Sequence, residues 1–365
     1  MTRRRQLLKA GALGALGATA SFTTGAYAQT QPSVRWRMAA LYPRSLDTCY
    51  GSTEQMCKRV AELTNGKFTI TLHPPGDLVP PLQVLDAVSA GTVEAGQVSG
   101  SFYFGKNPAL MFESGLPFGM NVRQQNAWLY EAGGLKEVQK VFAGFNCHSV
   151  PCGNFGTQMG GWFRKEINSL KDLSGLKMRI GGFGGQVISR LGVVPQMIPG
   201  GDLYAALEKG VIDAAEFVGP YDDEKLGLAK VTQYYYSPGW WEGGSAQVSA
   251  IANQKAWAAL PKDYQAAFEV AAFESNMRML AIYDSKNPDA IQRILSSGVK
   301  LRWFPKEILD VAYDTTISML EEISSKDADF KAIYQHYRNF LNKQSSWYRV
   351  ADHFLDSYSL SRRGR

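Results

Sequence analysis

The alternation of strand-like and helix-like segments constrains the fold of this chain most. Residues 33–41 (SVRWRMAAL) and 67–72 (KFTITL) alternate apolar with polar side chains, as half-buried strands do. A segment with helical character, residues 45–63, lies between them, and residues 83–90 form a second, shorter one. The order strand, helix, strand, helix predicts an α/β fold, in which helices cover the faces of sheets.

A second block of the same type covers roughly residues 153–242. Its strands are expected at residues 176–180, 196–198 and 214–218, and its helices at residues 185–191 and 202–209. A long helix over residues 257–282, a short strand at residues 300–303 and helices from residue 306 onward are expected to follow. Because no low-complexity linker separates the blocks, we expect two lobes joined by crossing strands rather than two tethered domains.

The first 28 residues have the composition of a targeting signal. A basic head with Arg4 and Arg5 precedes an apolar stretch over residues 10–20 and the small-residue triplet Ala26-Tyr27-Ala28. This arrangement predicts a twin-arginine-type signal peptide over residues 1–28, with export to the periplasm and removal of the signal. A membrane anchor is disfavoured because the apolar stretch is shorter than the ~20 residues that a span requires.

The net charge gives no support for a nucleic-acid partner. The chain has 39 Lys and Arg against 33 Asp and Glu, a net charge of +6, but four of the basic residues lie in the predicted signal. The remainder is close to neutral, and its aromatic residues are not interleaved with basic clusters. Proteins that bind nucleic acids present a basic patch, so this class is excluded.

The cysteines are expected to stay unpaired. Cys49 and Cys57 are eight residues apart, which places them about 12 Å apart along one helix, too far for a disulfide. Cys147 and Cys152 flank an extended segment and are therefore also too far apart to form a disulfide with each other. The chain contains no CxxC pair and no Cys/His spacing typical of a metal site. We therefore predict four free thiols, although an oxidising compartment permits a disulfide.

The run GLKMRIGGFGGQ, residues 175–186, places an arginine in a strand just before a cluster of glycines. With a period of two, Met178 faces the core while Lys177 and Arg179 share the opposite face. A dinucleotide loop is disfavoured because Val187 stands where G-x-G-x-x-G needs its third glycine. Arg179 is then either a surface residue or a carboxylate clamp at the end of a strand, where open α/β sheets bind ligands.

The chain resembles the solute-binding subunits of TRAP transporters, the DctP-like family, over residues 173–223. The shared pattern is a strand ending in Lys-x-Arg, a Gly-Val-x-Pro segment, a Tyr-x-Ala-Leu helix and a Gly-Val-x-Asp-Ala turn. The segments FTITLHPPGDL and LDAVSAGTVEAGQ agree as well, so the resemblance covers the mature chain. The segments AEFVGPYDDEKLGL and YYYSPGWWEGG are most similar to the branch that binds small 2-oxo and 2-hydroxy acids such as pyruvate or lactate.

This resemblance implies a two-lobed periplasmic binding protein type II fold with crossing strands and a long C-terminal helical segment. Lobe I would comprise residues 31–152 and 247–302, and lobe II residues 153–246. The apolar positions of residues 303–365 recur at helical spacing, and they would pack on the chain itself or, through an exchanged helix, on the second subunit of a homodimer. Binding of a small organic acid would close the lobes, and the closed form would dock on the TRAP membrane permease.

The resemblance assigns the ligand carboxylate to Arg179. If Glu216, Glu242 and that carboxylate converge on one arginine, three negative charges face one positive charge, and a hard cation would relieve the excess. The resemblance implies Na⁺ or Ca²⁺, held by the side chains of Gln158, Glu216 and Glu242 and by the backbone carbonyl of Phe217. It implies no organic cofactor. The alternatives are a structural salt bridge for Glu216, with Arg179 as a candidate partner, and an exposed loop carboxylate for Glu242.

Polar residues in glycine-rich segments complete the expected substrate site. Tyr103 in SGSFYFG, and Asn154 and Gln158 in GNFGTQMGG, are suited to hydrogen-bond a keto or hydroxyl oxygen, or are ordinary loop residues. The related branch typically has Trp at position 217, so Phe217 could enlarge the pocket for a larger or aromatic carboxylate. The walls are expected among aromatic residues that could equally belong to the core: Trp162, Phe217, Trp240 and Trp241.

Nothing in the chain indicates an enzyme. The four histidines are scattered, and neither a G-x-S-x-G elbow nor an H-E-x-x-H helix is present. Glu216 and Glu242 could in principle do acid–base work, but we expect a binding protein. A ligand sensor that serves a signalling receptor would use the same closed cleft, and it is the alternative function.

Overall fold

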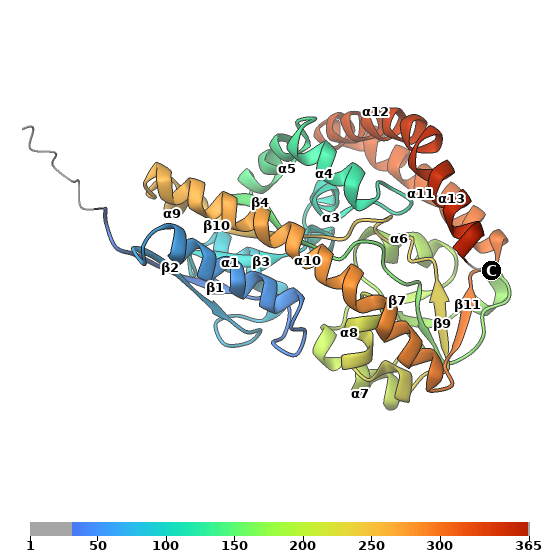
Figure 1. Ribbon diagram of the computed structural model, residues 1–365. Coiled ribbons are helices and arrows are strands. Elements are labelled where there is room, and N and C mark those ends of the chain that lie inside the picture. Colours follow the sequence, from blue (N-terminus) through green and yellow to red (C-terminus); the bar gives the residue numbers. More distant parts are fainter. Residues whose placement is uncertain (1–30, 364–365) are drawn as a thin grey trace, which may run out of the picture. The chain divides into compact units, whose positions relative to one another are not determined.

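Two β-sheets organise the chain (Figure 1). The computed structural model describes residues 31–363, so the predicted signal peptide lies outside the described residues. The first sheet has the strand order β2-β1-β3-β10-β4, and the second has the order β11-β9-β5-β8-β6-β7. The first sheet consists of β1 (Val34–Ala39), β2 (Phe68–His73), β3 (Ala95–Val98), β4 (Cys147–Asn154) and β10 (Gln247–Asn253). The second consists of β5 (Gly161–Phe163), β6 (Lys177–Arg179), β7 (Val194–Gln196), β8 (Ala214–Ala215), β9 (Tyr234–Ser237) and β11 (Lys300–Trp303).

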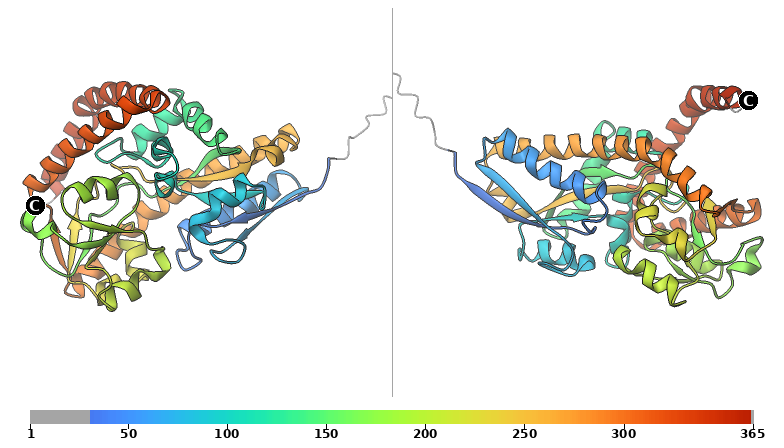
Figure 2. Two further views of the ribbon diagram at one scale, coloured as in Figure 1. Left: turned by 180° about the vertical axis from the view of Figure 1, so that it is seen from behind. Right: turned by 60° about the horizontal axis from the view of Figure 1, so that its bottom comes forward.

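Helices surround both sheets and fill the C-terminal third of the chain (Figures 1 and 2). Those before the second sheet are α1 (Cys49–Leu63), α2 (Val84–Ser89), α3 (Met111–Ser114), α4 (Val122–Tyr130) and α5 (Gly134–Ala143). Those interleaved with its strands are α6 (Gly182–Arg190), α7 (Leu203–Glu208) and α8 (Pro220–Lys225). The remaining helices are α9 (Gln254–Ala258), α10 (Lys262–Ser296), α11 (Lys306–Lys326), α12 (Ala328–Val350) and α13 (Asp352–Arg363).

Two short segments, residues 155–160 and residues 238–246, cross between the sheets, and helix α10 makes a third crossing between β10 and β11. The first crossing joins β4 to β5 and the second joins β9 to β10, which confirms the predicted α/β architecture with crossing strands. One predicted boundary is wrong. Strand β11 pairs in parallel with β9, so residues 300–302 belong to the second sheet and not to lobe I. A short strand carries no local mark of its partner, because pairing joins segments that are distant in sequence.

Helix α10 connects the two sheet regions. Its N-terminal part packs on α1 and β4, and Tyr264 stacks on Phe68 of β2 with ring centroids 5.7 Å apart. Its C-terminal part packs on α8, where the Tyr283 hydroxyl donates to Asp222 Oδ2 at 2.5 Å. The sequence predicts an end at residue 282, yet the helix continues through Pro288 to residue 296. The buried side chain of Ile294 extends the packed face and keeps this part helical.

The C-terminal helices pack partly on their own chain. Phe330 of α12 lies 5.2 Å from Phe112 between ring centroids, and the Tyr337 hydroxyl accepts a hydrogen bond from the Met120 backbone at 2.9 Å. By contrast, the end of α12 and α13 leave large apolar side chains mostly exposed: Trp347, Val350, Phe354, Leu355, Tyr358 and Leu360. A helix with an uncovered apolar face of this kind is suited to contact another surface.

The four cysteines are buried and free, as predicted. Two lie on α1 and two on β4, so the geometric argument against pairing within each set applies. Among the described residues, no helix combines the length and the apolar character that a membrane crossing requires.

Candidate functional site

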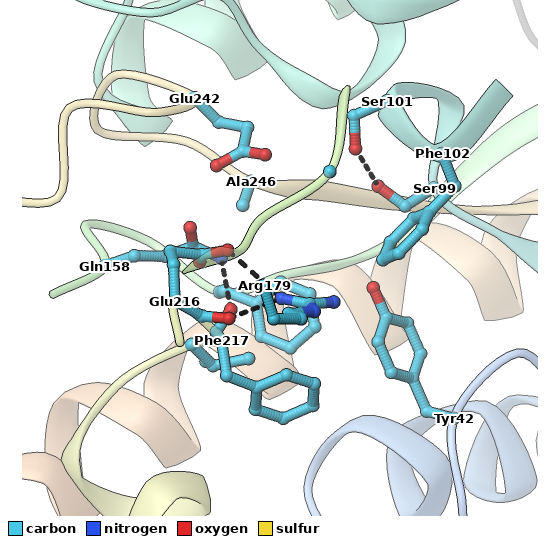
Figure 3. Close-up of a pocket in the computed structure, with 13 residues that line it drawn as sticks. Tyr42, Ser99, Ser101, Phe102, Gln158, Arg179, Glu216, Phe217, Glu242 and Ala246 are labelled. Atoms are coloured by element: carbon cyan, nitrogen blue, oxygen red, sulfur yellow. Dashed lines mark hydrogen bonds and ion pairs between the residues drawn. The ribbon is translucent and has the colours of Figure 1, made fainter. Parts of the chain in front are cut away.

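A small enclosed pocket lies where the two crossing segments meet the ends of β3 and β6 (Figure 3). Its cavity volume is only about 30 Å³, so the pocket is small and largely closed. The first lobe contributes Tyr42, Ser99, Ser101 and Phe102, and the crossings and second lobe contribute Phe155, Gln158, Arg179, Gly181, Glu216, Phe217, Val218, Glu242 and Ala246. The pocket therefore combines one permanent cation and two carboxyl groups in a space suited to a ligand of few atoms.

Arg179 reaches the pocket because of its position in β6. Met178 is completely buried on one side of the strand, Lys177 is exposed, and Arg179 is only 3% exposed. Strand β6 runs parallel to both β7 and β8, so Arg179 stands at the carboxyl end of a strand inside the sheet. Open α/β sheets bind ligands at this edge, and the predicted placement of the side chain away from the Met178 face is correct.

The guanidinium of Arg179 is held by acceptors of its own chain. Nη1 donates to the backbone oxygen of Glu216 at 2.5 Å and to its Oε2 at 3.1 Å, and Nε donates to the Ile198 carbonyl at 3.1 Å. The rings of Phe102 and Phe217 lie 5.8 Å and 5.3 Å from the guanidinium carbon. Within residues 31–363, Nη2 makes no hydrogen bond, so this corner of the fork is the one left for a ligand oxygen.

The two carboxyl groups are held in an unfavourable environment for charge. Burial raises the pKa of Glu216 well above its usual value, and the nearby Glu242 charge adds to this, while Arg179 opposes it. Enclosure likewise raises the pKa of Glu242 to about 7, again against the effect of Arg179. One arginine therefore does not fully stabilise both carboxylates, and either a proton or a second cation would lower the free energy of the buried pair.

The oxygens near Gln158 fit a hard cation. One terminal atom of its amide lies 2.9 Å from Glu242 Oε2 and 3.2 Å from Glu216 Oε1, and the other lies 3.5 Å from the backbone oxygen of Phe217. As an NH₂ group, the first atom donates to both carboxylates; as an oxygen, it is repelled by both unless a cation lies among them. Two carboxylates, an amide and a carbonyl form an all-oxygen donor set, which Na⁺ and Ca²⁺ prefer. No cluster of three or more His, Cys, Asp or Glu suited to a metal occurs in residues 31–363.

Five of the seven predicted site residues line this pocket: Gln158, Arg179, Glu216, Phe217 and Glu242. The predictions for Tyr103 and Asn154 are corrected. The Tyr103 hydroxyl is buried in the first lobe and accepts from the Leu85 backbone at 3.3 Å. The amide of Asn154, the last residue of β4, donates to Ser245 Oγ at 2.9 Å and so ties β4 to the second crossing. Both side chains stabilise the frame of the pocket without lining it.

The tryptophans predicted as walls belong to the core. Trp162 stacks on Tyr235 at 4.0 Å and donates to Asp223 Oδ2 at 2.9 Å. Trp240 and Trp241 pack against each other with ring centroids 4.0 Å apart. Of the four aromatic candidates, Phe217 alone is in the lining.

The sequence interpretation missed the first-lobe side of the pocket: Tyr42, Ser99, Ser101 and Phe102. Three of these precede the predicted Tyr103 in the segment SGSFYFG, so the prediction identified the right segment but the wrong side chain. In Figure 3 the Tyr42 hydroxyl points toward the Arg179 guanidinium across the cavity. A ligand on Arg179 would therefore lie between the two lobes.

Comparison with known proteins agrees with this geometry. The family model for bacterial extracellular solute-binding protein family 7, DctP, matches residues 40–327. A protein of Nostoc sp. named monocarboxylate 2-oxoacid-binding periplasmic protein is 49% identical over 363 residues, 98% of this chain and 99% of the relative.

Solved structures of TRAP transporter solute-binding proteins share the fold. That of Bordetella bronchiseptica, a dimer with calcium and picolinate, has 54% identity and a TM-score of 0.90, covering 92% of this chain and 99% of its own. Those of Colwellia psychrerythraea, with calcium and pyruvate, and Pseudoalteromonas atlantica, with sodium and pyruvate, have 36% and 35% identity. Each has a TM-score of 0.85 and covers 89% of this chain and 99% of its own. The chain belongs to the DctP family of solute-binding proteins of TRAP transporters.

Proposed function

We propose that this protein captures a small monocarboxylate, a 2-oxo or 2-hydroxy acid such as pyruvate or lactate, together with Na⁺ or Ca²⁺, and delivers it to a TRAP permease. One observation carries the proposal: Arg179, Glu216, Glu242 and the oxygens at Gln158 converge in a single small pocket. A carboxylate ligand would accept a hydrogen bond from Arg179 and offset its charge, and a cation would offset the negative charge of the carboxylates. In this proposal the ligand carboxylate contacts Nη2 of Arg179.

The charges support a cation that binds with the acid. Two ionised carboxylates, the ligand carboxylate and one guanidinium sum to −2, which Ca²⁺ cancels and Na⁺ halves. Gln158, Glu216, Glu242 and the Phe217 carbonyl are the proposed ligands. The related proteins hold either calcium or sodium with an organic acid, which agrees with a site that stabilises charge without a dedicated metal cage.

An aromatic carboxylate is a second candidate ligand. Phe102 and Phe217 lie on the guanidinium of Arg179 and offer flat apolar surface beside the place proposed for the carboxylate. The Bordetella protein holds picolinate, a planar aromatic acid whose ring nitrogen lies next to the carboxylate. The small cavity favours pyruvate or lactate, whereas its aromatic lining favours picolinate.

Export and dimer formation complete the proposal. Residues 1–28 would direct the chain to the periplasm and then be removed, which intact-mass measurement on secreted protein would test. The exposed apolar side chains of α13, such as Phe354 and Leu355, would pack on a second subunit, as the dimer of the Bordetella protein suggests. Light scattering would test this, and a monomeric mass would contradict it.

Thermal-shift measurements test the ligand proposal directly. The chelator-treated protein is melted with pyruvate, lactate or picolinate, each alone and with Na⁺ or Ca²⁺. Ligands that bind only the folded state raise the melting temperature, so we expect the acids to do so and cations to increase the effect. Pyruvamide, which lacks the carboxylate, is the matched control and should be inactive. The absence of a shift with every acid and cation would overturn the proposal.

A further inference from the structure

A chain of buried hydrogen bonds runs from the first-lobe core to the pocket. Glu113, 2% exposed, accepts from the backbone of Gly100 at 2.5 Å and from Ser114 Oγ at 2.8 Å, both at Oε2. Ser114 Oγ lies 2.9 Å from Ser99 Oγ, which lies 3.3 Å from Ser101 Oγ (Figure 3). Ser99 and Ser101 line the pocket, whereas Glu113 and Ser114 do not.

The chemistry of the groups sets the direction of each hydrogen bond. The N–H of Gly100 can only donate, so Oε2 of Glu113 is an acceptor. Ser114 has one hydroxyl hydrogen, and it is committed to this oxygen. The contact between Ser114 and Ser99 therefore requires Ser99 to donate. Once the hydrogen of Ser99 is used, Ser99 offers only lone pairs to any further neighbour.

The same groups also fix the backbone of this segment. Ser114 Oγ accepts from the Ser101 N–H at 2.8 Å, so Glu113 and Ser114 together hold two successive amides of the turn Gly100–Tyr103. A Cβ at Gly100 would lie 2.1 Å from the Leu110 oxygen and 2.9 Å from Glu113 Oε2, so only glycine permits this approach. The orientation of the hydroxyls is thus built into a rigid turn.

Protonation of Glu113 does not reverse the donor–acceptor direction of these hydrogen bonds. Burial raises the pKa of this carboxyl to about 7, but its Oε1 lies 2.5 Å from Ser249 Oγ. A proton on Oε1 can be donated to Ser249, and Oε2 then remains the acceptor of Gly100 and Ser114. The direction of the chain is therefore the same in both charge states.

We propose that Glu113 and Ser114 are positioning residues that make Ser99 a pure hydrogen-bond acceptor. Ser101 then donates to Ser99 in the absence of a ligand and can turn this one hydrogen toward a ligand oxygen. This inference rests on the proposed function and deepens it. Ser99 would accept from the hydroxyl of a 2-hydroxy acid, and Ser101 would donate to the oxygen of a 2-oxo acid. One acceptor and one donor side by side allow the pocket to hold both classes of acid.

The variant Ser114→Ala tests whether Ser99 is held as an acceptor, and it alters no side chain that lines the pocket. It frees the hydrogen of Ser99 to donate, which favours a keto oxygen and disfavours a hydroxyl. One hydrogen bond changes a binding constant by about two- to tenfold, and here a bond is lost for one acid and gained for the other. We expect the affinity ratio of pyruvate to lactate, measured by calorimetry with saturating cation, to rise at least fivefold. Glu113→Gln is the matched control: its amide oxygen still accepts at the Oε2 position and its NH₂ donates to Ser249, so the ratio should stay unchanged.

A second variant keeps the test sharp if Ser114→Ala folds poorly. Ser99→Ala removes the acceptor and should weaken lactate at least fivefold more than pyruvate. If either variant weakens both acids equally, or favours lactate, the assigned direction is wrong. If the wild-type protein binds neither acid, the proposed function fails and this inference with it. An unchanged ratio in a protein that binds both acids overturns the inference alone.

Discussion

Replacement of Arg179 by methionine is the most direct test of the site. Methionine preserves much of the volume of the buried stem but removes the charge and all N–H donors. The guanidinium is 3% exposed, so its contact with a ligand carboxylate would form in an environment with almost no water. Loss of one partner of a buried, hydrogen-bonded charge pair costs about 3–5 kcal/mol. At about 1.4 kcal/mol for each factor of ten, the dissociation constant should rise at least about 100-fold.

The stability of the ligand-free variant should fall by less than this. Glu216 loses its ion-pair partner, but its pKa is already raised by burial, so the carboxyl group takes up a proton instead of remaining charged. Binding is measured by calorimetry with pyruvate and cation, and folding by circular dichroism melts without ligand. Lys177→Met is the matched control, because Lys177 stands on the same strand with an exposed side chain and should bind as the wild type does. Retention of affinity within tenfold in Arg179→Met would refute the assignment of Arg179.

Three further predictions follow from other contacts. Glu242→Gln removes one proposed cation ligand, so the increase of melting temperature that cations add to the acid should be largely lost, while a full effect would exclude Glu242 from the cation site. Burial raises the pKa of Asp222 from 3.8 to about 7, so the folded protein retains a proton that the unfolded chain releases, and stability should fall as pH rises from 4 to 7, by up to about 1.4 kcal/mol per unit. Denaturant melts of Asp222→Asn should show a shallower decline, and an equal slope would contradict the assignment. Asp47, before α1, forms an ion pair with Lys225 of α8 and accepts from Tyr221 at 3.2 Å, which joins the first lobe to the second. The pair is partly exposed, and such pairs contribute about 0–1 kcal/mol. Asp47→Asn should therefore increase the rate of ligand release, measured by stopped-flow, by less than about fivefold, and the lobes should still close.

Local pattern was sufficient for much of this fold. Alternation and β-branched residues placed β1 and β2, and the period of two in residues 176–180 separated Met178 from Arg179. These features depend on neighbours in sequence, since side-chain direction in a strand repeats every second residue. The resemblance in residues 173–223 indicated the family, and five residues predicted from it line the pocket.

Tertiary structure decided which side chains of a correct segment reach the ligand site. In SGSFYFG the turn Gly100–Tyr103 directs Ser99, Ser101 and Phe102 to the pocket and sends the Tyr103 hydroxyl to the Leu85 backbone. A short turn has no fixed period, so its side-chain directions follow from packing and from the hydrogen bonds to Glu113 and Ser114. The partner of β11 and the hydrogen bond by which Asn154 ties β4 to the second crossing were likewise decided by segments distant in sequence, which no local pattern records.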